Sequence, residues 1–169
     1  VCPLCGYHHP IGALERIAQL ADAGTWVEVA SDVRSGDPLR FVDVRPYRDR
    51  IKAAQLATGL LEAFVAGRCR IDGLPVALGV LDFSFLGGSM GAAVGESFWR
   101  LVQRAIADQV PLVVVTSSGG ARMQEGLISL LQMAKTVVAL DVLSETRLPF
   151  VVVLANPTTG GVLASFATL

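Results

Sequence analysis

Two short glycine-containing segments have the composition of loops that stabilise a negative charge. They are Ser117-Ser118-Gly119-Gly120-Ala121 and Pro157-Thr158-Thr159-Gly160-Gly161, and each follows an apolar run and precedes a helical pattern. Backbone N–H groups at the start of a helix have no partner within the helix and lie at the positive end of its dipole. Adjacent glycines let a ligand approach because no Cβ stands in the way. Such segments suit a phosphate or the oxyanion of an enolising carbonyl, and two of them at successive strand–helix junctions favour a binding site over ordinary turns.

A third segment, Gly87-Gly88-Ser89-Met90-Gly91, matches the Gly-x-Ser-x-Gly pattern of serine hydrolases. That chemistry needs an acid and a histidine after the serine, whereas both histidines, His8 and His9, precede it. The pattern therefore does not favour a hydrolase. Glycines spaced four residues apart, continuing to Gly95, instead predict a smooth helix ridge for close packing. The two loops described first match neither a P-loop nor a dinucleotide-binding fingerprint.

A pair of cysteines near the N-terminus has the spacing of a zinc knuckle. Cys2 and Cys5 are separated by two residues, but a structural zinc ion needs four ligands. Either His8 or His9 completes the set, or the pair is one half of a four-cysteine ribbon. Cys69 lies in a strand-like segment, where a small core residue is expected.

The composition narrows the class of protein. The 169 residues contain 14 Lys and Arg, 15 Asp and Glu, and 52 % hydrophobic residues, with a mean hydropathy of +0.54. This predicts one domain with a sheet buried on both faces or with a large subunit interface. No basic run marks a nucleic-acid-binding surface. With three cysteines and no signal-peptide pattern, we expect a cytoplasmic protein.

The chain pattern predicts an α/β fold built from parallel crossovers. An uncharged stretch at 148–169 is long enough to cross a membrane, but Asn156-Pro157 and the following glycines interrupt it, so we expect strand, loop and helix there. We expect this last helix to be cut short and the chain to be a fragment. The other expected helices cover 10–24, 46–58, the residues after 91 to about 109, and 122–146. The expected strands are 26–30, 64–71, 75–83, 111–116 and 150–155. A hairpin turn is expected at Asp72-Gly73.

Several blocks of sequence, taken together, closely resemble the carboxyltransferase β subunit of bacterial acetyl-CoA carboxylase. The resemblance covers essentially the whole chain, and its blocks are FLGGSMG at 85–91, SGGARMQE at 118–125, LQMAKT at 131–136 and PTTGGV at 157–162. It implies a partial crotonase-like ββα spiral at 10–169 and the remnant of a zinc ribbon at 1–9. It also implies transfer of a carboxyl group from carboxybiotin to acetyl-CoA, which gives malonyl-CoA for fatty acid synthesis.

The resemblance also implies roles for particular residues and partners. Gly160 and Gly161 match the oxyanion-hole glycines of the family, and Gly119 and Gly120 match a loop of the same pocket. The implied partners are a homologous α subunit that completes the site, the biotin carboxyl carrier protein and biotin carboxylase. The residues implied to bind the CoA thioester are Gly87, Gly88, Ser89, Met90 and Arg122, and those implied to bind zinc are Cys2 and Cys5.

Two positions depart from the family pattern. Asn156 stands where aspartate usually precedes Pro-Thr-Thr, and Ser97 stands where a basic residue is common. These departures leave open a pathway-specific acyl-CoA carboxyltransferase or a malonyl-thioester decarboxylase subunit on the same scaffold. A non-catalytic zinc-ribbon binding module is a third hypothesis. The chemistry favours the first reading, because a thioester enolate needs fixed hydrogen-bond donors and no side-chain nucleophile.

Overall fold

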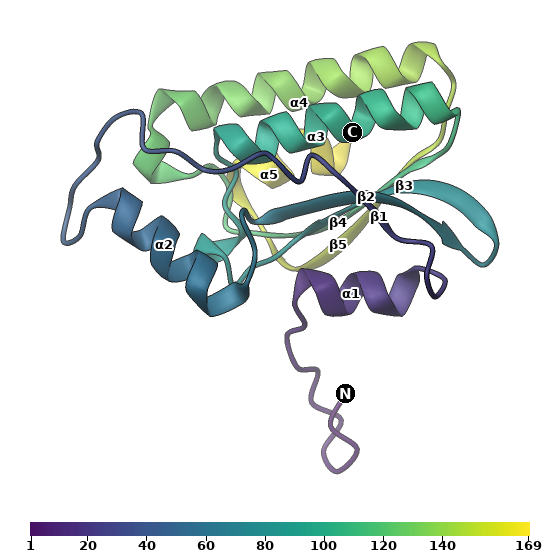
Figure 1. The fold of residues 1–169 in the computed structure, drawn as a ribbon, viewed down its shortest axis with the longest axis horizontal. Helices are drawn as coiled ribbons and strands as arrows, with labels where there is room; N and C mark the ends of the chain where they lie inside the picture. The colour runs from purple at the N-terminus through teal and green to yellow at the C-terminus, as the bar shows by residue number, and fades with distance from the viewer.

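A five-stranded mixed sheet with helices on both faces positions the glycine loops (Figure 1). The computed structural model describes residues 1–169. Helix α1 lies against one face of the sheet, and α3, α4 and the short α5 lie on the other (Figure 1). The elements in chain order are α1 (Ala13–Leu20), β1 (Val27–Val29), α2 (Tyr47–Thr58), β2 (Phe64–Ile71), β3 (Leu74–Leu81), α3 (Ala92–Asp108), β4 (Leu112–Ser118), α4 (Leu127–Glu145), β5 (Phe150–Thr158) and α5 (Gly160–Leu163), with 3₁₀ turns at Leu86–Gly88, Met123–Glu125 and Phe166–Thr168.

The sheet has strand order β1-β2-β3-β4-β5 and changes character at β3. Strands β1, β2 and β3 are antiparallel, and the predicted hairpin is confirmed, with Asp72 and Gly73 both at positive φ. Strands β3, β4 and β5 are parallel and are joined through α3 and α4. The prediction of parallel crossovers therefore holds for this half of the sheet. It brings the carboxyl ends of β4 and β5 together, and these are the ends that carry the two glycine loops.

Helices α3 and α4 pack closely because two glycines of the predicted ridge face α4 and the turn before it. A Cβ atom on Gly91 would lie 2.5 Å from Oε1 of Glu125, and one on Gly95 would lie 2.1 Å from Oε1 of Gln132. The ridge prediction is thus confirmed for these two positions. On the sheet side of α3, the ring of Phe98 lies 4.6 Å from that of Phe166, centroid to centroid, which ties α3 to the C-terminal turn.

Two expected helices differ from the observed ones. The helix expected at 122–146 is broken at Gly126, whose φ of 52° and ψ of −129° lie outside the helical region, so a 3₁₀ turn precedes α4. The helix expected at 10–24 is confirmed only at 13–20, where the N–H of Ala13 donates to Oδ2 of Asp82 at 2.7 Å. Residues 1–12 form neither helix nor strand and project from the body of the protein (Figure 1).

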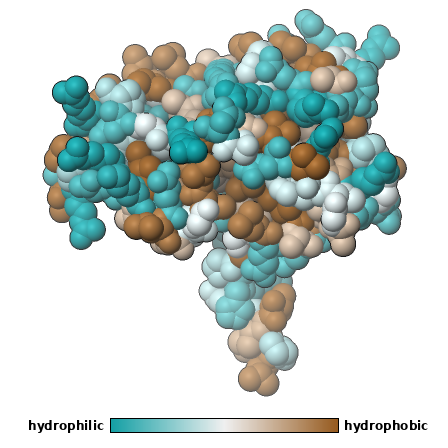
Figure 2. All heavy atoms as spheres, in the orientation of Figure 1, coloured by the Kyte–Doolittle hydropathy of each residue, from teal (hydrophilic) through white to brown (hydrophobic).

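Two parts of the protein, α4 and the edge strand β5, leave apolar side chains exposed. On α4 the side chains of Leu127, Leu130, Leu131 and Val138 are each more than half exposed, and β5 is the edge strand of the sheet with Val151, Val153 and Leu154 exposed. Figure 2 shows apolar side chains along the rim where Figure 1 places α4. By length and composition α4 could also cross a membrane, a criterion that core helices of soluble proteins meet as well. The exposed side chains of β5 do not agree with the expectation of a sheet buried on both faces, and the expectation of a large interface stays a prediction.

Candidate active site

The two double-glycine loops lie against each other at the carboxyl ends of β4 and β5. The N–H of Thr159 donates to the carbonyl of Ser118 at 2.9 Å, which joins the ends of the two strands. A Cβ atom on Gly120 would lie 2.8 Å from the backbone nitrogen of Gly161, and one on Gly160 would lie 3.0 Å from the carbonyl oxygen of Gly119. Because backbone meets backbone at these distances, only glycine fits here. The structure thus brings together the four glycines that the sequence singled out.

The free hydrogen-bond donors of this site are found on only part of these loops. The N–H of Gly119 donates to the carbonyl of Gly87 at 2.9 Å, and the N–H of Gly120 donates to Oγ of Ser118 at 3.0 Å. By contrast, the N–H groups of Ala121, Gly160 and Gly161 make no hydrogen bond. A Cβ atom on Gly161 would lie 3.2 Å from the nitrogen of Ala121, so Gly161 lies beside the Ala121 donor. Residues 119 and 120 therefore shape the site, while residues 121, 160 and 161 carry the donors available to a ligand.

Ala121 is a site residue that the sequence reasoning missed. It directly follows the Gly119-Gly120 pair, and attention to the glycines themselves passed over the first N–H after them. The one feature of the sequence that could have pointed to it is the small side chain of alanine, which leaves the N–H group beside it accessible to a ligand. A group of two or three backbone donors with no competing acceptor is the arrangement that stabilises a developing oxyanion.

The loop at 87–91 lies behind the site. Met90 is fully buried, and its N–H donates to the carbonyl of Gly120 at 2.7 Å, while its carbonyl accepts from the N–H of Arg122 at 2.9 Å. A Cβ atom on Gly88 would lie 2.0 Å from the carbonyl oxygen of Ser117. The expected contact of Gly87, Gly88, Ser89 and Met90 with CoA stays a prediction, and the loop supports the Ala121 segment through its backbone.

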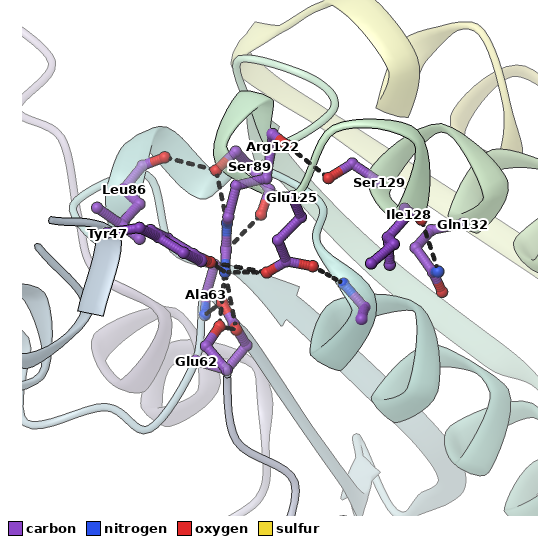
Figure 3. Close-up of polar contacts among 12 residues, drawn as sticks. Tyr47, Glu62, Ala63, Leu86, Ser89, Arg122, Glu125, Ile128, Ser129 and Gln132 are labelled. Carbon is purple, nitrogen blue, oxygen red and sulfur yellow. Dashed lines mark hydrogen bonds and ion pairs between the residues drawn. The ribbon is translucent and has the colours of Figure 1, made fainter. Parts of the chain in front are cut away.

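Arg122 is held by protein groups on every side (Figure 3). Its side chain has no exposed surface, and Nη1 and Nη2 donate to the two carboxylate oxygens of Glu62. Nε donates to Oγ of Ser89 at 3.0 Å and Nη2 to the carbonyl of Ser89 at 2.6 Å. Nη1 also reaches Oγ of Ser35 at 2.7 Å and the hydroxyl of Tyr47 at 3.1 Å. Direct contact with CoA stays a prediction, and in this structure the guanidinium offers no surface for it.

A second buried carboxylate, that of Glu125, extends this cluster. Its Oε1 accepts from the hydroxyl of Tyr47 at 2.7 Å, and its Oε2 accepts from the N–H of Ala92 at 2.6 Å, at the start of α3. Nη1 of Arg122 lies 3.7 Å from Oε1. The positive end of the α3 dipole and the guanidinium both stabilise this buried charge. We call Glu62, Tyr47, Arg122, Glu125 and Ser35 the arginine cluster.

The electrostatics of the arginine cluster keep the Tyr47 hydroxyl protonated and the Arg122 guanidinium charged. Burial raises the pKa of the Tyr47 hydroxyl well above its usual range, against the lowering effect of the Arg122 charge, so the hydroxyl remains a donor to Glu125. Burial acts to lower the pKa of Arg122, but the hydrogen bonds and the charge of Glu62 outweigh it and raise that pKa. The guanidinium is therefore charged at any physiological pH.

A cavity of about 610 Å³ opens beside the ends of β3, β4 and β5. Ser117 from the first double-glycine loop, and Asn156 and Pro157 at the end of β5, form one wall. The opposite wall comes from the segment before α1, including His8 and His9, and from Arg16. Ser117 and Pro157 belong to the two double-glycine loops, but no residue with a free donor lines the cavity, so the cavity and the donors share the ends of β4 and β5 and no lining residue.

The residues present do not fit a zinc site. No group of three or more His, Cys, Asp or Glu side chains is arranged to hold a metal. Cys2 and Cys5 lie in one turn, in which backbone hydrogen bonds from Cys5 and Leu4 lower the pKa of the Cys2 thiol, but two sulfur ligands leave a tetrahedral ion incomplete. The histidines that follow do not join them. Cys69 is buried in β2, as expected of a core residue.

Known proteins resemble this chain over its whole length. Residues 13–168 match the carboxyl transferase domain family. The acetyl-coenzyme A carboxylase carboxyl transferase subunit beta of Opitutus terrae is 53 % identical over 100 % of this chain and 58 % of that protein. The subunit of the same name from Thermus thermophilus is 54 % identical over 100 % of this chain and 59 % of that protein. The chain thus spans little more than half the length of these curated relatives.

Solved structures of a transcarboxylase and of a decarboxylase are also similar to this chain. Transcarboxylase 12S with methylmalonyl-coenzyme A and methylmalonic acid bound has a TM-score of 0.72 at 28 % identity, over 91 % of this chain and 28 % of that one. A Pseudomonas malonate decarboxylase hetero-tetramer in complex with malonate has a TM-score of 0.67 at 26 % identity, over 87 % of this chain and 51 % of that one. These neighbours share the crotonase-like α/β fold that the resemblance implies. The chain belongs to the carboxyl transferase domain family.

Proposed function

We propose that this chain is the catalytic portion of a carboxyltransferase β subunit of acetyl-CoA carboxylase, which converts acetyl-CoA to malonyl-CoA. The observation that carries the proposal is the group of free N–H donors on Ala121, Gly160 and Gly161. Identity of 53 % and 54 % to the named relatives supports the choice of reaction. The reaction takes place in the cytoplasm, as the free cysteines suggest.

The backbone donors do the chemistry that this chain supplies. When the methyl C–H bond of acetyl-CoA breaks, negative charge develops on the thioester oxygen, and the N–H groups of Ala121, Gly160 and Gly161 donate to that oxygen. The enolate carbon then forms a C–C bond to the transferred carboxyl group. Carboxybiotin, when bound, supplies that carboxyl group through cleavage of its N–CO₂ bond and takes up the proton that acetyl-CoA loses. The donors are in place before the reaction, so they need no rearrangement as the charge forms.

The partner that completes the site is a homologous α subunit, which docks on the exposed apolar side chains of α4. Leu127, Leu130, Leu131 and Val138 are each more than half exposed, and a cluster of exposed apolar side chains on one helix is typical of an interface. Carboxybiotin arrives on the biotin carboxyl carrier protein after its carboxylation by biotin carboxylase. Light scattering should detect a hetero-oligomer, and a stable, active monomer would contradict this part of the proposal.

A malonyl-thioester decarboxylase is the second candidate. The similarity to the Pseudomonas malonate decarboxylase favours it, as does Asn156 in place of the aspartate of the family. The same donors would stabilise the same enolate, formed in this case by loss of CO₂ from a malonyl thioester.

One experiment separates the two candidates. The full-length protein, purified with its α subunit, is incubated with carboxybiotin and a panel of acyl-CoAs that includes acetyl-CoA and propionyl-CoA. Formation of malonyl-CoA from acetyl-CoA supports the carboxyltransferase, and a clear preference for another acyl-CoA would replace the substrate. Decarboxylation of malonyl thioesters without biotin supports the second candidate, and no product in either assay contradicts both.

The zinc ribbon remains a separate proposal, outside the chemistry. We infer that Cys2 and Cys5 are half of a four-cysteine site, because a turn with two thiols is its usual half. Elemental analysis should find one zinc per full-length chain, lost in the Cys2→Ser variant. For these 169 residues alone it should find much less than one equivalent. A full equivalent there would point to His8 or His9 as ligands.

A further inference from the structure

The arginine cluster touches the candidate site through two peptide groups. The first is the Ser89–Met90 peptide, whose carbonyl accepts from Nη2 of Arg122 at 2.6 Å. Its N–H donates to the carbonyl of Gly120 at 2.7 Å. That carbonyl belongs to the second peptide group, Gly120–Ala121, which carries the free N–H of Ala121. An unbroken series of hydrogen bonds therefore leads from the buried guanidinium to an N–H donor of the site.

We propose that Arg122 is a positioning residue that aims and polarises the Ala121 N–H through this series of hydrogen bonds. The inference rests on the proposed function and adds to it, since it makes the rate of the reaction depend on a residue that touches no substrate. Its chemical target is the oxyanion of the acyl-CoA enolate.

The geometry of the peptide group gives the direction of the Ala121 N–H. The one cis peptide bond of the chain is Asn156–Pro157, so the Gly120–Ala121 bond is trans and its N–H points opposite to its C=O. The carbonyl of Gly120 is held toward Met90, and so the N–H of Ala121 is held away from the 87–91 loop. The N–H of Arg122 donates to the carbonyl of Met90 at 2.9 Å, which fixes the other side of Ala121.

The charge of Arg122 adds polarisation to this direction. A cation at the Ser89 carbonyl increases the dipole of the Ser89–Met90 peptide, and successive hydrogen bonds polarise each other in a low-dielectric interior. The N–H of Met90 becomes a stronger donor to Gly120, and the N–H of Ala121 becomes a stronger donor in turn. The energy of an oxyanion contact depends on this donor strength.

The rest of the cluster holds the guanidinium in its place. Glu62 binds it through both carboxylate oxygens, and the Tyr47 and Ser35 hydroxyls accept from Nη1, so the guanidinium plane has one orientation. An ammonium group lacks this planar fork and cannot hold Glu62 and the Ser89 carbonyl together. Arg122→Lys therefore keeps the positive charge and loses the simultaneous hydrogen bonds to Glu62 and the Ser89 carbonyl.

The first test is steady-state kinetics of full-length Arg122→Lys and Glu62→Gln proteins in complex with the α subunit. Because a displacement of about 1 Å at a site can cost about a hundredfold in rate, we expect kcat of Arg122→Lys to fall by about 10- to 100-fold, with KM for acetyl-CoA within about twofold. Glu62→Gln keeps the shape of the cluster and should give a smaller fall in kcat. Arg100→Lys is the matched control, because Arg100 pairs with Asp32 and Glu96 at the surface.

The second test does not depend on the activity. Hydrogen exchange followed by mass spectrometry on the same proteins should show faster exchange at 87–92, which contains the Met90 amide, in Arg122→Lys and Glu62→Gln. Exchange in the β2–β3 hairpin and in the Arg100→Lys protein should match the wild type. If the wild type makes no malonyl-CoA, the proposed function fails, while the exchange measurement still decides whether Arg122 holds the Met90 peptide.

Three results would overturn the inference. The first is unchanged hydrogen exchange at 87–92 in both Arg122→Lys and Glu62→Gln. The second is a normal kcat in a variant whose exchange at 87–92 has increased. The third is a raised KM for acetyl-CoA with unchanged kcat, which would make Arg122 a binding residue. If Arg122→Lys does not fold, Glu62→Gln carries both tests with the same criteria.

Discussion

The free-donor loops and the arginine cluster lie next to each other at one end of the sheet, yet their polar groups are in opposite states. In the cluster every guanidinium N–H has an acceptor, although Arg122, Glu62 and Glu125 are all buried. At the loops, the N–H groups of Ala121 and Gly161 have no partner. Ala121 and Gly161 are partly exposed and Gly160 is exposed, so their donors can meet solvent or a ligand, whereas the donors of the buried cluster are all taken up inside the protein. The saturated cluster gives the stability that holds the unsaturated site in shape.

The largest effect should come from removing a free donor. Gly161→Pro deletes one N–H, and the loss of one oxyanion donor lowers turnover by about a hundredfold to a thousandfold. Gly161→Ala keeps this donor, but its Cβ atom would lie 3.1 Å from Sδ of Met133 and 3.2 Å from the nitrogen of Ala121, so we expect a partial loss of turnover that is smaller than that of Gly161→Pro. Kinetics in the complex, together with melting temperature and CoA binding, check the result. A folded Gly161→Pro enzyme with normal turnover would show that the chemistry is elsewhere.

A smaller effect is expected from blocking the approach to the donors. Gly160 has a φ of 54°, and a Cβ atom there would lie 3.0 Å from the carbonyl oxygen of Gly119, so Gly160→Val strains the backbone and obstructs the thioester. We expect a rise in KM for acetyl-CoA together with a lower kcat, about tenfold in kcat/KM. Gly36→Val is the control, because nothing lies within 4 Å of a Cβ atom at that position. Equal effects of the two variants would contradict the assignment.

In the arginine cluster, Tyr47→Phe should act first on stability. It leaves an oxygen of Glu125 without its hydroxyl donor, and an unsatisfied buried polar group lowers the free energy of unfolding by about 1–3 kcal/mol. Thermal and urea denaturation measure this change. Tyr7→Phe, at an exposed tyrosine, is the matched control and should have no effect. Equal stability of Tyr47→Phe and wild type would mean that water or Arg122 replaces the hydroxyl without loss.

The smallest effect should come from Ser89→Ala. Its Oγ donates to the carbonyl of Leu86 at 2.8 Å and accepts from Nε of Arg122 at 3.0 Å, so its loss lowers stability by about 1 kcal/mol. Turnover should stay within about threefold of wild type, because position 89 supports the site through its backbone carbonyl. An inactive, folded Ser89→Ala enzyme would show that this hydroxyl, and not only the backbone carbonyl of position 89, is needed for turnover.

Local features of the fold were predictable from sequence, and long-range ones were not. The hairpin at Asp72-Gly73 follows from its turn residues, and the helix expected at 46–58 follows from its local pattern. The hairpin is confirmed, and the helix is observed at 47–58. The break at Gly126 was missed although a glycine near the end of a helical pattern is itself a possible break, and only its backbone angles in the structure show that the helix begins after it. The pairing of Arg122 with Glu62 joins residues 60 positions apart and leaves no pattern in the sequence.

The candidate site was predictable in position but not in detail. Two glycine pairs after parallel strands imply adjacent loops, and the structure has them. The N–H of Gly120 donates to Oγ of Ser118 and the N–H of Gly119 donates to the carbonyl of Gly87, so these two donors are not free. Sequence spacing cannot reveal such competition, and so the importance of Ala121 emerged only from the structure.

The open edge of β5 has a consequence for handling the protein. An edge strand with unpaired backbone groups and exposed Val151 and Val153 is a template for strand addition by another chain. Val151 and Val153 pair with Val113 and Val115 on the sheet face that carries α1, so α4 does not cover them. Produced without whatever covers this edge, the protein should aggregate or be retained by chaperones, and co-expression with the covering chain should restore solubility.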